Sequence, residues 1–382
     1  MENFTFFNPT RIEFGKDKEK LIGQHLANYG IKKVLLCYGS ERIKRDGLFD
    51  AVKKSLDEKG IAIVEIGGII SNPVISKVRE AIALGRAQHV DAILSVGGGS
   101  VLDSAKAIAA GIAFTGDIWD LFLGKSGIDV ALPIFDIMTL AATGSEMNDG
   151  AVVTNEKTKE KFFIGSEALY PKVSIVNPVL MQSVPKDYLV YSATDIIAHS
   201  IEGYFTASHQ PHLQSRIVEA IINTVIETTE ILLSDSTHYD ARAEFAWAST
   251  LALNGLTTSG TGGFSFPNHM IEHSLSALFN VPHGAGLSVV IPAWMKWFCE
   301  HNISQFERFA KEIFKKASAQ EGIEALENWF NKIGTPTRLS QLNIAEHQLP
   351  LVIDNVLGNA QRFGLSEIYT EDVIRIILRN AL

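Results

Sequence analysis

Carboxylate and imidazole side chains recur at helical spacing in the middle of the sequence. Asp195 and His199 are four residues apart, His269 and His273 have the same spacing, and His283 follows ten residues later. Side chains four residues apart project from one face of a helix. Imidazoles with one carboxylate suit zinc, iron or a similar divalent ion and argue against calcium or magnesium. A single such pair is usually a surface ion pair or a buried histidine. Three such groups in one chain make a metal site about as probable as these structural explanations.

A run of three glycines, residues 97–99, is a second feature with chemical potential. The run and Ser100 follow an apolar strand pattern and open a helical pattern. Backbone amides can approach an anion closely at glycine, and the helix N-terminus adds its dipole, so a pyrophosphate is the natural ligand. The run does not match the glycine fingerprint of ordinary Rossmann folds. The alternative is a tight turn in which Ser100 caps the helix and Asp103 completes a capping box, which leaves the three glycines unexplained.

A loop rich in hydroxyl groups follows another apolar run. It extends from Thr139 through Thr143 to Glu146. Such a loop is suited to bonding a ribose or a nicotinamide, and a helix cap rich in Ser and Thr explains it equally well. Lys161 lies in a charged stretch and would by itself be a solvated surface residue.

Composition restricts the class of protein. The chain has 382 residues, of which 46% are hydrophobic, and this is enough for two domains with large cores. Its net charge of −9, without a block of Lys and Arg, argues against nucleic acid as a partner. Two cysteines indicate a reducing compartment without structural disulfides. No signal-peptide pattern follows Met1 and no apolar run reaches about 18 residues, so the sequence predicts a cytoplasmic protein without a membrane partner.

The first half of the chain alternates between two periodicities. Apolar runs at 33–38, 61–66 and 92–96 alternate with helical patterns at 48–59 and 74–88. This alternation predicts an α/β domain with a parallel, Rossmann-like sheet that is covered on both faces.

Helical patterns alone occupy the second half. Beyond Pro185 they recur at 193–207, 214–233, 241–253, 269–279 and 303–316. We therefore expect a dinucleotide-binding α/β domain over residues 1–182 and an all-helical, metal-binding domain over residues 183–382. At the N-terminus, residues 4–14 predict two short strands around Asn8, and an exposed aromatic hairpin there would allow two subunits to pair as a homodimer.

The ordered set of motifs resembles one family. The sequence is similar to the iron-containing (group III, metal-dependent) alcohol dehydrogenases, and especially to their butanol dehydrogenase and NADPH-dependent aldehyde reductase branch. The resemblance extends from Asn8 to Pro336. Each motif is moderately specific and the ordered set is highly specific. The motifs are the glycine run with Ser100 and Asp103, Thr143 to Glu146, Asp195 with His199, and His269 with His273 and His283.

The resemblance implies a role for each matching position. One divalent ion, Fe(II) or Zn(II), would be held by Asp195, His199, His269 and His283. His273 would lie near the substrate instead of on the metal, and it is the candidate catalytic proton relay. The residues that would bind the dinucleotide are Asn72, Gly97, Gly98, Gly99, Ser100, Asp103, Thr139, Thr143 and Lys161.

The segment after residue 38 bears on the choice of cofactor. NAD-preferring relatives tend to place an acidic residue at this strand end, where the chain has Tyr38 and Gly39, with Ser40, Lys44 and Arg45 close by. Arg42 follows, and a guanidinium pairs well with a 2′-phosphate. We therefore expect Gly39, Ser40 and Arg42 to bind NADP(H). NAD is the alternative, because Glu41 would repel a phosphate if it pointed inward.

The expected reaction is the interconversion of small aldehydes and primary alcohols by hydride transfer. A phosphorylated substrate is disfavoured, because no cluster of Arg and Lys lies near the segment from His269 to His283. Three alternatives stay open: an NAD-dependent glycerol or diol dehydrogenase, a dehydroquinate-synthase-like lyase that uses NAD and a metal, and a metal-binding protein without enzymatic activity.

Overall fold

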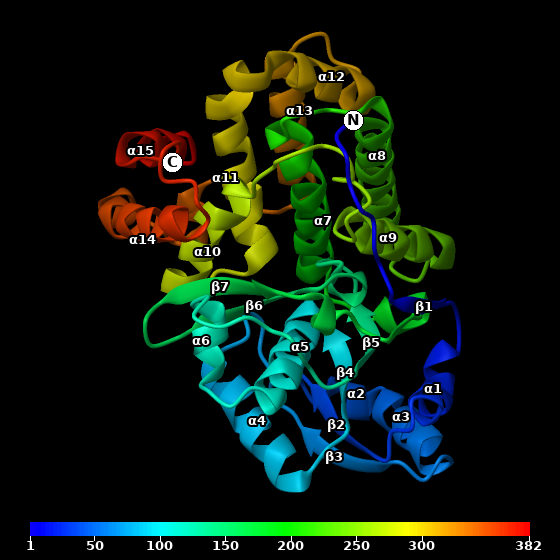
Figure 1. The fold of residues 1–382 in the computed structure, drawn as a ribbon. Coiled ribbons are helices and arrows are strands. Elements are labelled where there is room, and N and C mark those ends of the chain that lie inside the picture. Colours follow the sequence, from blue (N-terminus) through cyan, green and yellow to red (C-terminus); the bar gives the residue numbers. More distant parts are fainter. The chain divides into compact units, whose positions relative to one another are not determined.

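A six-stranded sheet forms the centre of one of two units in the structure, a computed structural model that describes residues 1–382 (Figure 1). The strand order is β1-β8-β5-β4-β2-β3, and every neighbouring pair is parallel. The expected parallel α/β sheet is therefore confirmed. The strands are β1 (Arg11–Phe14), β2 (Lys33–Tyr38), β3 (Ala62–Ile66), β4 (Ala92–Gly98), β5 (Ile134–Leu140) and β8 (Val173–Val176).

The chain contributes to both units discontinuously. The α/β unit consists of Phe7–Ser183 and Thr237–Asn254. The helical unit consists of Met1–Phe6, Val184–Ser236 and Gly255–Leu382. Helix α9 (Tyr239–Ala252) thus belongs to the α/β unit, although it lies in the second half of the sequence.

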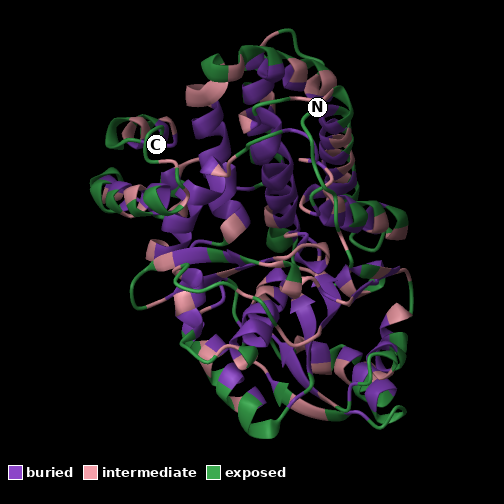
Figure 2. Ribbon diagram, viewed as in Figure 1, coloured by how far each residue is buried: buried purple, intermediate pink, exposed green.

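The two faces of the parallel sheet differ in chemistry. One face is apolar, and its side chains, such as Leu36 and Leu94, pack against α1 (Ile22–Asn28) and α3 (Leu48–Asp57). Because side chains alternate along a strand, the residues between them point to the opposite face. There Ser95, Asp136 and Ser174 lie side by side on β4, β5 and β8, and all three are fully buried. Figure 2 shows these strands coloured as buried along most of their length.

The remaining elements of the α/β unit surround this sheet. A separate antiparallel hairpin, β6 (Gly150–Asn155) with β7 (Glu160–Gly165), was not predicted from the sequence. The other helices are α2 (Arg42–Arg45), α4 (Ile75–Gln88), α5 (Gly99–Ala113) and α6 (Ile118–Phe122), with a short 3-10 helix, η2 (Ser145–Met147), after β5.

The hairpin expected at residues 4–14 is wrong. Only β1 forms there, and it pairs in parallel with β8. The preceding residues have no regular structure. Instead of a turn, the side chain of Asn8 donates hydrogen bonds to the backbone carbonyls of Met147 (2.8 Å) and Asn254 (3.2 Å).

The helical unit contains no strand, which confirms the all-helical second half. Helices α7 and α10 are buried along most of their length (Figure 2). None of the helices in the chain is long and apolar enough to cross a membrane. The helices of this unit are α7 (Lys186–Thr206), α8 (His212–Ser234), α10 (Pro267–Phe279), α11 (His283–Phe298), α12 (Ile303–Phe314), α13 (Ala319–Ile333), α14 (Leu349–Arg362) and α15 (Glu371–Asn380).

Candidate metal centre and cofactor loops

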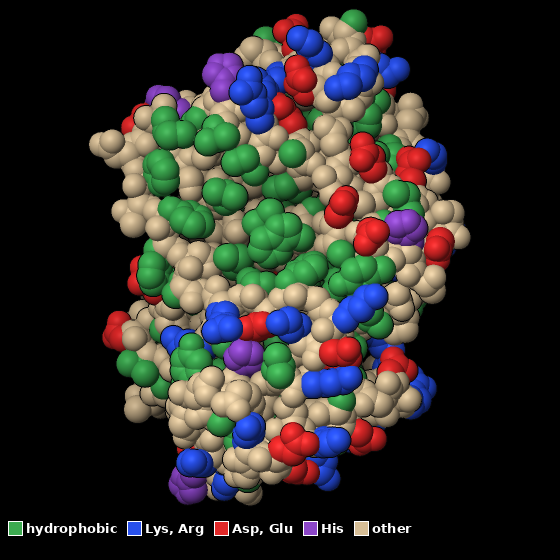
Figure 3. All heavy atoms as spheres, turned by 90° about the vertical axis from the view of Figure 1, so that its right-hand side faces the viewer, with side chains coloured by type: hydrophobic (Ala, Val, Ile, Leu, Met, Phe, Trp, Pro, Cys, Tyr) green, Lys and Arg blue, Asp and Glu red, His purple; other side chains and the backbone are tan.

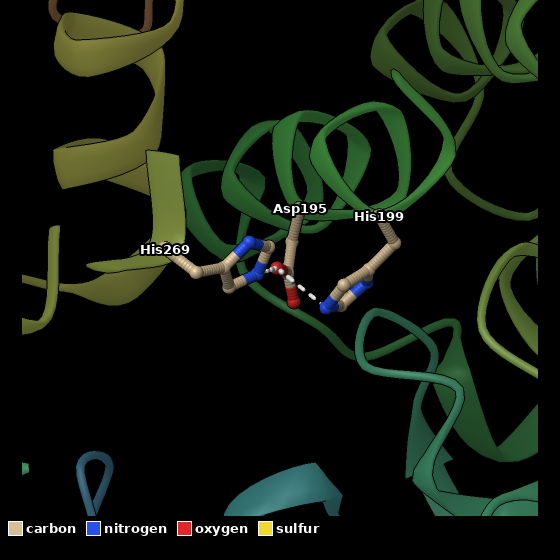
Figure 4. A group of neighbouring side chains, drawn as sticks. All are labelled: Asp195, His199 and His269. Atoms are coloured by element: carbon tan, nitrogen blue, oxygen red, sulfur yellow. Dashed lines mark ion pairs between the residues drawn. The ribbon is translucent and has the colours of Figure 1, made fainter. Parts of the chain in front are cut away.

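Three helices of the helical unit bring one carboxylate and three imidazoles together. Helix α7 carries Asp195 and His199, α10 carries His269, and α11 begins at His283. Asp195 Oδ1 lies 3.6 Å from Nε2 of His199, 3.7 Å from Nε2 of His269 and 3.5 Å from Nε2 of His283. Figure 4 shows the first three side chains converging. The rings of His199 and His269 are stacked with their centroids 4.7 Å apart. The four side chains that the resemblance assigns to a metal therefore meet at one place.

This constellation fits a single divalent ion. Oδ1 of Asp195 and Nε2 of His269 are buried and form no hydrogen bond, a costly arrangement unless another group binds them. The ligand atoms of Asp195, His199 and His269 all lie within 4.8 Å of one another. Ligands at about 2.1 Å from a tetrahedral ion are roughly 3.4 Å apart, close to the distances observed here. One carboxylate oxygen among three imidazole nitrogens is a typical donor set for zinc or ferrous iron.

Two buried carboxylates hold the outer nitrogens of these imidazoles. Nδ1 of His269 donates to Glu202, and Nδ1 of His283 donates to Glu272. Both glutamates are fully buried. Such contacts direct the Nε2 lone pair of each ring toward a metal. We did not predict either glutamate from the sequence, although Glu202 follows His199 by three residues and so lies on the same face of α7.

Burial and neighbouring charges shift the protonation of this group. Burial raises the pKa of Asp195, but the charges of His199, His283 and His269 outweigh burial and hold this pKa at about 2. Burial lowers the pKa of His199 to about 4, so its ring is neutral at pH 7. Burial also opposes protonation of His269, but the carboxylates of Glu202 and Asp195 raise its pKa to about 10. A cation bound at Nε2 of His269 would therefore take the place of a proton.

His273 lies next to this group. Its side chain is buried, and its ring centroid is 6.3 Å from that of His269 and 5.9 Å from that of His283. The rings of Phe266 and His269 are perpendicular to one another with their centroids 5.7 Å apart, so Phe266 covers part of His269 with apolar surface. The imidazole of His273 is thus near enough to act on a small molecule bound beside the four converging side chains.

The glycine run of the α/β unit ends β4 and begins α5. A Cβ atom on Gly98 would lie 2.9 Å from the side chain of Leu140, and one on Gly99 would lie 2.4 Å from that of Thr143. The glycines are therefore needed because the hydroxyl-rich loop packs directly against them. The two loops that the sequence assigned to the dinucleotide are in contact within one unit. The alternative in which Ser100 caps the helix is wrong, because α5 starts at Gly99 without a side-chain cap.

Asp103 and Lys106 fasten the second loop to α5. The carboxylate of Asp103 accepts from the hydroxyl of Ser145 (2.7 Å) and from the N–H of Val152 (2.9 Å). Both oxygens of Asp103 are therefore engaged within the α/β unit. The ammonium of Lys106, which the sequence did not single out, is fully buried. It donates to the carbonyls of Ser145, Asn148 and Gly150 and to the Asn148 side chain, at 2.7–2.9 Å.

The other predicted cofactor residues lie in two places. Lys161 on β7 is buried and donates to the side chain of Asn72 at 3.1 Å, so it is not the solvated charge that its sequence context suggests. Asn72 has a left-handed backbone (φ 51°), which asparagine tolerates better than most residues. Thr139 is buried near the end of β5, and Thr143 accepts from the N–H of Ser145 (3.2 Å).

Acidic side chains accompany the basic ones after β2. Lys44 lies 3.4 Å from Glu41 and 3.1 Å from Glu65, and the hydroxyl of Tyr38 is 3.1 Å from Glu41. Arg42 donates to the carbonyl of Ser183 at 3.3 Å. Gly39 approaches the backbone of Ile69, where a Cβ atom would be 3.1 Å from the carbonyl oxygen. Arg42, on which the NADP(H) expectation rested, also lies 3.9 Å from the carboxylate of Asp46, so carboxylates accompany both Arg42 and Lys44.

Comparisons with known proteins agree with this geometry. Residues 9–178 match the family model for iron-containing alcohol dehydrogenase, and residues 189–382 match that for the C-terminal part of the Fe-containing alcohol dehydrogenase family. The chain is 38% identical over 385 residues to "Probable NADH-dependent butanol dehydrogenase 1" of Bacillus subtilis, covering 99% of both chains. It is 32% identical to the NADPH-dependent aldehyde reductase YqhD of Escherichia coli, covering 100% of both.

A solved structure extends the agreement to the fold. The crystal structure of NADH-dependent butanol dehydrogenase A from Thermotoga maritima superposes with a TM-score of 0.97 at 46% identity, covering 100% of this chain and 99% of that one. These matches favour a dehydrogenase over the lyase and the non-enzymatic protein considered above. The chain belongs to the iron-containing alcohol dehydrogenase family and is a metal-dependent oxidoreductase of alcohols and aldehydes.

Proposed function

We propose that this protein reduces small unbranched aldehydes to primary alcohols, and catalyses the reverse reaction, with Asp195, His199, His269 and His283 holding a divalent ion. The observation that supports this most strongly is the convergence of three Nε2 atoms on Asp195 Oδ1 at 3.5–3.7 Å. Relatives named as butanol dehydrogenases and an aldehyde reductase, which match over nearly their full lengths, support the substrate class.

In the proposed mechanism, side chains of this protein deliver the proton and exclude water from the site. When bound, the dinucleotide supplies a hydride for the carbonyl carbon, and the divalent ion supplies positive charge that stabilises the negative charge on the carbonyl oxygen. That oxygen then needs one proton to become the alcohol hydroxyl. We assign its delivery to His273, since a buried imidazole beside the site can donate a proton and recover one from water. Phe266 helps to exclude water from the group around His269.

The dinucleotide is assigned to the loops of the α/β unit. In our proposal the glycine run and Ser100 bind the pyrophosphate at the N-terminus of α5. Thr139 and Thr143 contribute hydroxyls beside it, and Lys161 and Asn72 form a buried polar pair for the remaining part of the cofactor. Asp103 and Lys106 act only through the loop that they fasten.

We further propose that NADH is preferred to NADPH. Glu41 lies directly beyond β2, and a carboxylate there can accept hydrogen bonds from the ribose hydroxyls of NAD. The same carboxylate repels a 2′-phosphate, and Glu65 competes for the positive charge of Lys44. Several relatives are named as NADH-dependent butanol dehydrogenases, which supports a preference for NADH over the preference for NADPH suggested by Arg42.

Replacing Glu41 with glutamine is expected to shift the ratio of kcat/KM for NADPH to that for NADH by about tenfold toward NADPH. Removing a like charge near the 2′-phosphate is worth about 1.4 kcal/mol when the two are in contact. Steady-state kinetics with both cofactors would measure this shift. Glu371→Gln is a matched control. Glu371 is also an exposed carboxylate in an ion pair, with Arg375, but it belongs to the helical unit. A wild-type enzyme that already prefers NADPH would contradict the proposal.

The reaction itself is tested by elemental analysis of the purified protein together with an oxidation assay. We expect one zinc or iron per chain, and consumption of NADH with butanal as the substrate. Turnover restricted to glycerol and other polyols with NAD⁺ would identify a glycerol or diol dehydrogenase instead. A protein that carries the metal but oxidises neither NADH nor NADPH with any aldehyde would contradict the proposed reaction.

We propose that two copies of the chain associate as a homodimer. Hydrophobic side chains gather on the face drawn in Figure 3. In the N-terminal segment of the helical unit, Met1, Phe4 and Phe6 are 65%, 51% and 47% exposed. Such exposed apolar residues are typical of protein interfaces. Light scattering of the wild type and of a Phe4→Ser, Phe6→Ser variant would test this, and a monomeric wild type would contradict it. Cys37 and Cys299 are free, which is consistent with the cytoplasmic location that we propose.

A further inference from the structure

The two carboxylates behind the converging imidazoles differ in what their second oxygen binds. Each gives one oxygen, Oε2, to the Nδ1 of a histidine. The other oxygen of Glu202 faces backbone donors, whereas the other oxygen of Glu272 faces a hydroxyl. This difference determines which carboxylate an amide side chain can replace.

Glu202 needs two acceptor oxygens. Its Oε1 accepts from the backbone N–H groups of Asn268 (2.5 Å) and His269 (3.2 Å) in the first turn of α10. Its Oε2 accepts from Nδ1 of His269. A backbone N–H can only donate, so neither side of the Glu202 side chain can present a donor without conflict.

Glu272 is in a more adaptable environment. Its Oε1 accepts from the hydroxyl of Ser276, which also lies 3.2 Å from the carbonyl of Val281. A hydroxyl both donates and accepts. If an amide replaced this carboxylate, Ser276 could accept from the amide N–H and donate to Val281. The oxygen that faces His283 would stay an acceptor.

We propose that Glu202 is a positioning residue that fixes the tautomer of His269, with the proton on Nδ1 and the Nε2 lone pair directed at the divalent ion; this rests on the metal site proposed above. In a Glu202→Gln protein, one orientation of the amide places its oxygen against the two backbone donors. Its NH2 group then faces Nδ1 of His269. Nδ1 then has to accept, so the ring proton moves to Nε2, where it blocks coordination. The opposite amide orientation sets the NH2 group against two backbone N–H donors. Neither orientation satisfies all partners.

The test compares Glu202→Gln with Glu272→Gln. Each variant removes one buried negative charge behind one imidazole, so the two differ chiefly in their hydrogen bonds. Zn²⁺ affinity would be measured by competition with a chromophoric chelator, and the visible absorption of the Co²⁺-loaded proteins would report the number of nitrogen ligands. We expect Glu202→Gln to bind Zn²⁺ about 10- to 100-fold more weakly than the wild type. We expect a smaller loss in Glu272→Gln than in Glu202→Gln, because the oxygen that faces His283 stays an acceptor.

Each outcome bears on the proposal. Equal weakening in both variants would show that charge and not the tautomer matters, and unchanged affinity in Glu202→Gln would also overturn the proposal. A wild type that binds no Zn²⁺, or a His269→Ala protein with wild-type affinity, would instead refute the metal site itself.

A second variant covers the case in which Glu202→Gln does not fold, as judged by the unfolding midpoint of the metal-free protein. Glu202→Asp retains two acceptor oxygens and should retain one Zn²⁺ per chain. A folded Glu202→Asp protein without Zn²⁺ would overturn the proposal.

Discussion

Replacing His269 with alanine is expected to abolish metal binding and aldehyde reduction together. The substitution removes an Nε2 atom that lies 3.7 Å from Asp195 and leaves Glu202 buried without its imidazole partner. Loss of the ion removes several kcal/mol of transition-state stabilisation, so kcat should fall by about 10³-fold or more. Elemental analysis and steady-state kinetics on the same preparation would measure both effects.

His273→Ala is the matched control for this experiment. His273 is also a buried imidazole, one turn further along α10, but its Nδ1 and Nε2 do not belong to the group that converges with Asp195 and His199. We expect this variant to retain the metal and to turn over about 10²- to 10⁴-fold more slowly, the usual contribution of a general acid. Full metal occupancy in His269→Ala would reject the ligand assignment, and loss of metal in His273→Ala would make His273 a ligand.

Replacing Lys106 with methionine is expected to be the most destabilising single change in the α/β unit. The substitution removes the ammonium from four oxygen acceptors at 2.7–2.9 Å, of which the Asn148 side-chain oxygen keeps the N–H of Gly150 as a donor. It also removes a positive charge that interacts with Asp103, Asp149, Glu146 and Asp136. Burial lowers the pKa of Lys106 to about 8, which shows that these partners only partly offset its desolvation. Breaking a buried charge pair typically costs about 3–5 kcal/mol.

Urea unfolding of the variant would measure this loss. Lys125→Met is the control, since Lys125 is exposed and pairs only with Asp120, so it should change stability by less than about 0.5 kcal/mol. The affinity of Lys106→Met for NADH should fall as well, because Lys106 holds the loop that follows Thr143. A loss of stability below about 1 kcal/mol would mean that water or a rearranged loop replaces the ammonium.

Local patterns predicted the elements that need only their own residues. Strand β2 coincides with its apolar run, and α10 was expected two residues short of its observed start. The predicted N-terminal hairpin failed for a non-local reason. Asn8 bonds the backbone of Met147 and Asn254, which lie far away in the sequence, and these contacts replace a local turn. Hydrophobic alternation carries no information about such distant partners.

Site residues that share one helix face were predicted, whereas site residues whose partners lie far away in the sequence were missed. Asp195 and His199 share one helix face, and together with the later histidines their spacing made them candidates for one site. Glu202 acts on His269, which is 67 residues later in the chain. Lys106 acts on carbonyls that begin 39 residues later. Lone charged residues inside apolar helices were signals for both, but only packing in three dimensions identifies the groups that they neutralise.

The segments of the two units alternate along the chain, which constrains how the protein folds during synthesis and where it can be divided into fragments. When residues up to Ser183 have been synthesised, all strands of the sheet are present, but Thr250 is not. In the folded protein the hydroxyl of Thr250 donates to the carboxylate of Glu146 at 2.6 Å. The α/β unit therefore finishes folding only after a large part of the helical unit has been synthesised. Neither unit corresponds to one uninterrupted segment of the chain. A chimera between relatives has to exchange residues 237–254 together with the N-terminal half, and residues 1–6 together with the C-terminal half.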